Sequence, residues 1–290
     1  MFIITFIECV VSCFANHNGV KLKKKIENFM GILLLLIVFA VTVYYNFDSG
    51  YGCASGSRAS GTDRERAEKI DGTDEEGGKK NDYIKILGEK KVTIVIDPGH
   101  GGIDPGKVGI NDELEKNLNL AISLKLQEKL KELKINVVMT RSDDSQLSDN
   151  SDKGWKKTDM QNRVKIINES DADLCISIHQ NSYPSSNVKG AQVFYYSDSG
   201  KGKKLAALIQ NSLKTTLDDG NHRVEKSNDS YYILMKSECP TVIVECGFLS
   251  NWEEATNLKD DYYQGKIADA IVEGIIRYIK EGYINEELYQ

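Results

Sequence analysis

The sequence predicts one α/β domain in which helices flank a twisted, mostly parallel β-sheet. After residue 90, short apolar runs rich in Val and Ile alternate with segments that have the spacing of amphipathic helices. Such alternation indicates a parallel sheet, because a crossover between parallel strands usually contains a helix. The chain has 290 residues, and we expect this single domain to occupy residues 83–290.

The expected elements follow one another in a regular order. Strands are predicted over residues 92–96, 135–140, 174–178, 191–196, 231–235 and 241–245. Helices are predicted over residues 114–133, 160–169, 203–217 and 266–280. In the first of these helices Leu118, Ile122 and Leu126 recur every four residues, which places them on one face.

The N-terminal part of the chain predicts a transmembrane anchor or uncleaved signal over residues 29–47. Residues 29–45 are apolar and uncharged, and four lysines lie between residues 21 and 25. The run is long enough to span a bilayer, and the lysines place the N-terminus in the cytoplasm and the rest on the extracytoplasmic side. A cleaved signal peptide and a buried core helix are the alternatives. No small-x-small cleavage motif directly follows the run, which favours the anchor.

Two segments flank this anchor. Residues 1–28 would be cytoplasmic, but residues 1–20 are largely apolar, so they are either a membrane-associated segment or the product of a start site placed too early. Residues 48–82 are rich in Gly, Ser and mixed charge. They have too few large apolar side chains to form a core, which predicts a flexible polar linker.

Charge and cysteine content exclude two classes of protein. The net charge of −6 argues against a nucleic-acid partner, which requires a basic face. The six cysteines contain no C-x-x-C pair, and Cys175 and Cys246 fall in apolar strands. A free thiol in such a strand acts as a small apolar side chain, so a disulfide scaffold is not expected.

Two histidines follow predicted strands. His100 lies in the loop of residues 97–102 (DPGHGG), where glycines on both sides allow a sharp turn and leave the imidazole unshielded. His179 directly follows the strand over residues 174–178. Ligands bind where strands end in α/β sheets, so the two rings could share one site. Taken singly, each is more often a structural histidine.

Two glutamates complete a possible catalytic set. Glu115 begins the first long helix, where it also fits a capping box with Asp112. Glu245 ends an apolar strand, where a carboxylate needs a partner or a metal, although a salt-bridged core glutamate is the alternative. Two imidazoles and one carboxylate can bind Zn²⁺ and leave a position for water, while a second carboxylate acts as general base.

The motifs resemble, in content and order, those of the zinc-dependent N-acetylmuramoyl-L-alanine amidases. They are IDPGHGG, LEKNLNL, TRSDD, DADLCISIHQNS and CPTVIVECGFLSN, within about residues 91–280. The resemblance implies that His100, Glu115 and His179 bind one zinc ion and that Glu245 is the catalytic carboxylate. It also implies cleavage of the amide between N-acetylmuramic acid and L-alanine in peptidoglycan stem peptides.

A lone anchor followed by a bare catalytic domain is similar to the membrane-anchored spore-cortex (germination-specific) amidases. That similarity implies a part in forming the muramic-lactam of the cortex. An activating protein partner stays open, as does an action on the vegetative wall.

Polar residues beside the motifs are further candidates. Asp97 is expected to orient the His100 loop or a ring nitrogen. Arg141 and Asn181 stand near motif loops and are candidates for the substrate groove. Arg163 is expected to lie on a solvated helix face.

Two other functions are compatible with the residue types. A zinc peptidase or carboxypeptidase of cell-wall peptides would use a similar metal set, and would need a group, usually an arginine, that fixes a free carboxylate. A non-catalytic peptidoglycan-binding module should lack a ligand or the catalytic glutamate, whereas this chain has all four residues.

Overall fold

The structure is a computed structural model that describes residues 73–89, 91–149, 153–217 and 220–287. The described residues do not include the predicted anchor over residues 29–47 or the segment before it. They also do not include residues 48–72 of the predicted linker. Among the helices of the described part, none combines the length and the apolar composition that crossing a membrane requires.

Six strands form one mixed sheet with the order β2-β1-β3-β6-β4-β5. The strands are β1 (Thr93–Pro98), β2 (Asn136–Met139), β3 (Leu174–Asn181), β4 (Gln192–Tyr195), β5 (Lys226–Ser227) and β6 (Thr241–Phe248). Every neighbouring pair is parallel except β4 with β6. The prediction of a mostly parallel sheet is therefore confirmed, with one antiparallel pair that it did not include.

The antiparallel pair follows from the connection between β3 and β4. Residues 182–191 contain no helix, and a parallel crossover needs a dozen or more residues with a helix. The chain therefore turns back, and β4 runs against β6 along the far side of that strand.

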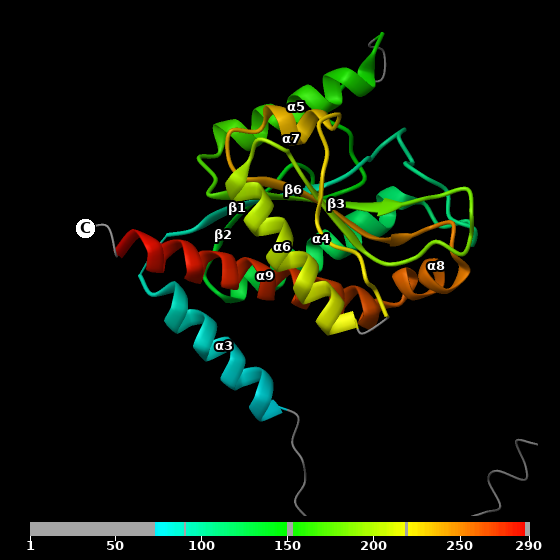
Figure 1. Cartoon of the computed structure of the whole chain (residues 1–290). Helices are drawn as coiled ribbons and strands as arrows, with labels where there is room; N and C mark the ends of the chain where they lie inside the picture. The colour runs from blue at the N-terminus through cyan, green and yellow to red at the C-terminus, as the bar shows by residue number, and fades with distance from the viewer. Residues whose placement is uncertain (1–72, 90, 150–152, 218–219, 288–290) are drawn as a thin grey trace, which may run out of the picture. The chain divides into compact units, whose positions relative to one another are not determined.

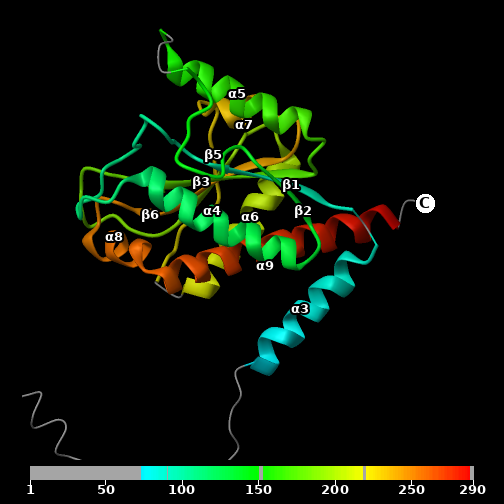
Figure 2. The same cartoon turned by 180° about the vertical axis from the view of Figure 1, so that it is seen from behind.

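Helices cover both faces of the sheet, as Figures 1 and 2 show. They are α3 (Thr73–Leu87), α4 (Glu115–Glu132), α5 (Trp155–Glu169), α6 (Gly200–Leu217), α7 (Tyr232–Lys236), α8 (Trp252–Lys259) and α9 (Asp261–Glu287). Helices α4, α6 and α9 contribute to one apolar cluster, and α5 and α7 to another on the opposite face. Helix α3 packs against α9, where the Tyr83 hydroxyl donates a hydrogen bond to Glu273.

The central strands carry apolar side chains on both faces because both faces are covered. In β1, Ile94 and Ile96 join the larger cluster while Val95 joins the smaller one. Cys175 and Cys246 are buried free thiols within these clusters, as their apolar surroundings predict.

One predicted strand is wrong: residues 231–235 mostly belong to the short helix α7. The segment is apolar and too short to show a helical period, so its sequence resembles a strand. Strand β6 already has β3 and β4 as neighbours, so this segment cannot pair with it. Ile233 and Leu234 pack instead on the face of the sheet. The side chain of Asn228 accepts hydrogen bonds from the backbone of Ser230 and Tyr231 and turns the chain into the helix.

Two further helices were not predicted. Helix α3 begins at Thr73, so residues 73–82 of the predicted flexible linker are helical, and Tyr83 and Ile84 pack on the core. Helix α8 begins after Asn251, whose side chain accepts a hydrogen bond from the backbone of Glu254. That Asn-x-x-Glu pattern is a capping signal that the sequence contained.

Candidate metal and active site

The catalytic candidates gather around a cavity of about 340 Å³ at the carboxyl ends of β1, β3 and β6. His100 follows β1, His179 lies in β3, and Glu245 lies in β6. Glu115 is the first residue of α4, and all four side chains line the cavity. The parallel strands bring together residues that are far apart in the sequence.

Three of these side chains converge on one point. The carboxylate of Glu115 lies 3.2 Å from Nε2 of His100 and 2.9 Å from Nδ1 of His179. One nitrogen of each histidine and one oxygen of the glutamate lie within 4.8 Å of one another. Two imidazole nitrogens and one carboxylate oxygen are a donor set that suits Zn²⁺, with a fourth position left for water. These residues therefore fit a zinc ion.

Glycines provide the space for this convergence. A Cβ atom on Gly99 would lie 2.2 Å from the ring of His179. On Gly106, whose φ is +69°, it would lie 2.5 Å from Oε2 of Glu115. His100 itself has a φ of 61°, a left-handed conformation that the surrounding loop must enforce. The glycine-rich loop thus lets a strand, a helix and a histidine ring meet closely.

Glu115 does not cap its helix, so the capping-box alternative is wrong. The N-cap of α4 is Leu114, and no side chain bonds there. The buried carboxylate instead accepts hydrogen bonds from the backbone of Lys107 (2.8 Å) and of Gln180 (3.1 Å). Burial alone would raise the pKa of Glu115, but hydrogen bonds with the two histidines hold that pKa far below its ordinary value. The carboxylate is therefore ionised.

Glu245 stands directly beside His179, because the two residues are in register in the β3–β6 pair. Its side chain is 7% exposed. Its Oε2 has no hydrogen-bond partner among the described residues, and no ion pair holds it, which contradicts the salt-bridged alternative. Burial raises the pKa of Glu245 to about 7. A carboxyl group that titrates near neutrality can both accept and donate a proton.

The second nitrogen of His100 has a partner that sequence reasoning missed. Nδ1 of His100 lies 2.8 Å from Oδ2 of Asp104, and the other oxygen of Asp104 lies 3.2 Å from the ammonium group of Lys156. A carboxylate on the outer nitrogen fixes the orientation of a ligating imidazole. The only signal in the sequence was an aspartate four residues after the histidine.

Asp97 supports the His100 loop without a hydrogen bond to either histidine ring. Its carboxylate accepts hydrogen bonds from Thr140, Ser177 and Arg163. Arg163 also donates to the backbone oxygen of His100 at 2.6 Å. Asp97 thus orients the loop through Arg163. The alternative, in which Asp97 bonds to a ring nitrogen, is wrong.

The prediction for Arg163 is wrong: it is 1% exposed. It forms ion pairs of 2.7 Å with Asp97 and 2.6 Å with Asp159, and these pairs compensate for the burial of the charge. Its helix packs that side onto the sheet, which helical spacing in this polar segment did not reveal.

The other two candidates have different positions. Arg141 is buried and donates to the backbone oxygens of Pro98 and Gly99, so it holds the loop and is absent from the cavity wall. Asn181 does line the cavity. Tyr231 lines the cavity too and packs edge-on against Phe194, but the sequence had placed it in a strand.

Residues 94–277 match the family model described as N-acetylmuramoyl-L-alanine amidase. The chain belongs to this family. It is an amidase of peptidoglycan, as its motifs predict, and the amidase interpretation is confirmed over the peptidase and the binding module.

Named relatives agree with this assignment. The amidase is 40% identical over 191 residues to the germination-specific N-acetylmuramoyl-L-alanine amidase of Bacillus subtilis, covering 65% of this chain and 80% of the relative. It is 31% identical over 237 residues to the amidase AmiA of Escherichia coli, covering 67% and 78%. It is similar in structure to the CwlD amidase of Clostridioides difficile, solved in complex with the GerS lipoprotein, with a TM-score of 0.63, 41% identity and coverage of 65% and 98%.

Proposed function

We propose that this amidase depends on one zinc ion, with His100, Glu115 and His179 as its protein ligands and Glu245 as the catalytic carboxylate. The observation that carries the proposal is the position of Glu245, whose unpartnered Oε2 is buried beside a converging His-Glu-His group. A buried carboxylate without a partner is unfavourable, and such groups are typical of functional sites.

In the proposed reaction, water adds to the carbonyl of the lactyl group and the bond to the nitrogen of L-alanine breaks. Bound zinc would supply a Lewis acid that polarises this carbonyl and lowers the pKa of water to about 7. Glu245 takes a proton from the attacking water and gives it to the departing nitrogen, which leaves as an amine. Asp104 holds the ring of His100 in place, and Asp97 and Arg163 hold the loop around it.

The protein's wider organisation is also a proposal. We assign residues 29–47 to a membrane anchor, residues 48–72 to a linker and residues 83–290 to the catalytic domain, preceded by most of α3. The amidase would then act on the extracytoplasmic side. Because the Bacillus relative is named germination-specific, we assign a part in spore-cortex muramic-lactam formation. The Clostridioides relative was solved with a lipoprotein, and an activating partner of that kind fits an enzyme tethered to the membrane.

The test is mass spectrometry of purified peptidoglycan digested by the full chain in detergent with added zinc. Free stem peptides with a new L-alanine amine are expected from the parent and from Glu128→Gln, a change at an exposed glutamate of α4. No free stems are expected from Glu245→Gln, although it retains zinc. Shortened peptides on intact stems would instead indicate a peptidase, and loss of zinc from Glu245→Gln would make Glu245 a ligand.

The cortex assignment needs a separate test. Expression in a spore former that lacks its own germination-specific amidase should restore muramic-lactam to the cortex. Restored vegetative lysis without muramic-lactam would contradict this role.

A further inference from the structure

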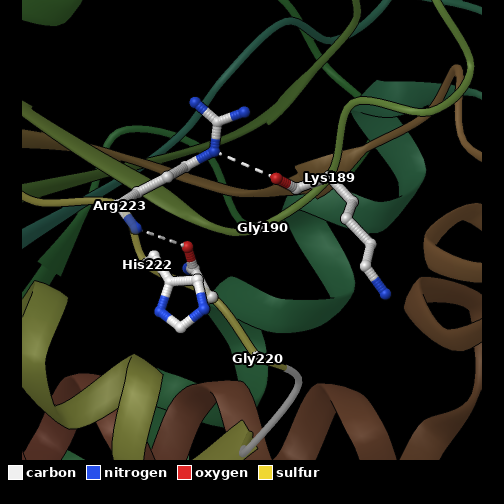
Figure 3. Close-up of a pocket in the computed structure, with 6 residues that line it drawn as sticks. Lys189, Gly190, Gly220, His222 and Arg223 are labelled. Carbon is white, nitrogen blue, oxygen red and sulfur yellow. Dashed lines mark hydrogen bonds between the residues drawn. The ribbon is translucent and has the colours of Figure 1, made fainter.

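A second, open cavity of about 390 Å³ lies beside the starts of β4 and β5 (Figure 3). It is lined by Lys189, Gly190, Gly220, Asn221, His222 and Arg223. Strand β4 runs antiparallel to β6, and β5 runs parallel to β4. The residues before β4 and β5 therefore lie at the end of the sheet where β6 terminates. The catalytic cavity lies at this same end.

Arg223 is held in one position there. Its Nε donates a hydrogen bond to the backbone oxygen of Lys189 at 3.0 Å, and its backbone N–H donates to Asn221 at 2.9 Å (Figure 3). Its guanidinium carbon lies 4.9 Å from the centre of the Phe248 ring, a cation–π contact. No hydrogen bond or ion pair joins its two terminal nitrogens to another described residue, and Figure 3 shows them directed away from the ring of His222.

Phe248 places this guanidinium on the catalytic face of the sheet. Phe248 is in register with Asn181, as Glu245 is with His179, and a register shift lies between the two pairs. His179 and Asn181 are two residues apart in one strand, so their side chains point to the same face. In-register neighbours share that face, so Phe248 and the arginine over it stand on the same side as Glu245.

The distance suits the substrate. Phe248 is three residues beyond Glu245, which at ~3.3 Å per residue is about 10 Å or, across the register shift, somewhat less. With about 3.8 Å between successive Cα atoms, a carboxylate on the stem residue after L-alanine lies within reach of that point when the scissile amide lies at Glu245. In peptidoglycan that next residue is acidic and carries a free or amidated α-carboxyl group.

We propose that Arg223 binds the free α-carboxylate of the stem-peptide residue that follows L-alanine, so that the amidase prefers stems whose α-carboxyl is not amidated. The inference rests on the proposed function, because it places the scissile bond at Glu245. A guanidinium with two free terminal nitrogens matches a carboxylate with paired hydrogen bonds, which a carboxamide cannot accept twice. Holding Arg223 in place beforehand reduces the ordering that binding requires.

The test uses two dipeptides as inhibitors of peptidoglycan digestion by the full chain with zinc. L-alanyl-D-glutamate and L-alanyl-D-isoglutamine differ only in that the second has a carboxamide in place of the α-carboxylate. We expect the parent to require about tenfold less of the free acid for half-inhibition. Arg223→Gln should bring the two values together, and Arg223→Lys should lie between.

Lys189→Gln is the matched control. It removes a positive charge from the same cavity, but the ammonium of Lys189 is exposed and pairs with Glu253, so the tenfold preference should persist. A preference that falls equally in both variants would show a general effect of charge and overturn the proposal. Zinc content and melting temperature of each variant check that folding is retained.

Three further outcomes would overturn the proposal. They are equal inhibition of the parent by both dipeptides, no inhibition by either, and an unchanged preference in Arg223→Gln. If Lys107→Gln abolishes the preference instead, the carboxylate belongs to Lys107, the one lysine or arginine among the described residues that line the catalytic cavity. Failure of the proposed function is seen separately, as absence of new L-alanine amines from the parent before any dipeptide is added.

Discussion

The two faces of the sheet are built differently. On one face the helices α4, α6 and α9 cover β1, β3 and β6 with aliphatic side chains. On the other, α5 and the five-residue α7 form a smaller apolar cluster beside the buried Arg163–Asp97 ion pair and the catalytic cavity. The first face contains most of the apolar burial that stabilises the fold. The second face can therefore hold charged groups whose burial is unfavourable, and the proposed catalytic carboxylate Glu245 lies there.

The largest expected effect is the loss of metal binding and activity on the second face, with the first face left intact. His179→Ala removes a proposed ligand, so zinc should fall from near one per chain to near zero and hydrolysis should stop. The melting temperature of the metal-free forms should hardly change, because the apolar face is intact. Elemental analysis and calorimetry check this, with His222→Ala as the control at an exposed histidine away from the metal group. Near-stoichiometric zinc in His179→Ala would remove it from the ligand set.

Arg163→Met should cause the largest loss of stability. It leaves Asp97 charged, buried and without its ion-pair partner, which typically lowers the free energy of unfolding by about 3–5 kcal/mol. Urea denaturation measures the loss. Lys165→Met, at an exposed position of the same helix, should change stability by less than about 0.5 kcal/mol. Equal effects of the two substitutions would show that the ion pair is not what matters.

Acid should weaken the same face. Burial would raise the pKa of Asp97, but Arg163 and two hydroxyl groups lower it from 3.8 to about 2. A lowered pKa in the folded state contributes stability at pH values above the ordinary pKa, and this is lost as the pH falls toward 2. The contribution is roughly 2 kcal/mol. Denaturation between pH 5 and pH 2 should therefore show a shallower loss for Asp97→Asn than for the parent, and parallel curves would contradict the assignment.

The smallest effect concerns the aliphatic face. Ile122 of α4 is fully buried there, so Ile122→Val should lower the free energy of unfolding by about 1 kcal/mol and leave turnover unchanged. Leu124→Ala, at a position 38% exposed on the same helix, should change stability by less than about 0.5 kcal/mol. A loss of activity in Ile122→Val would mean that the two faces are coupled more closely than the comparison implies.

The sequence predicted the parts of the fold that local patterns determine. Strand β3 contains a continuous apolar run and helix α4 has a clear helical period. His100 and His179 each follow a predicted strand, so the metal group could be expected before the structure. Arg163 and α7 were misjudged because their environments are set by distant parts of the chain. Helical spacing alone does not tell which polar face meets a buried aspartate, and the occupied edges of β6 are not visible in residues 231–235.

Two further residues show the same limit. Asp104 belongs to a loop whose path depends on glycine conformations, so its contact with His100 has no periodic signal. Arg223 was not a candidate in the sequence because its position depends on its contact with Phe248. Phe248 lies 25 residues later in the chain and two strands away in the sheet. Such contacts depend on how the chain folds in space, and no local pattern in a single sequence predicts them.

The reversed direction of β4 has a consequence for how this amidase could be modified. Because β3 ends and β4 begins at the same end of the sheet, residues 182–191 stay on the side of the molecule that holds the proposed catalytic site. Lengthening or exchanging this segment, whose Ser182 lines the catalytic cavity, would reshape the rim of that cavity and leave every strand crossover as it is. It is the natural place at which to graft new specificity onto the scaffold.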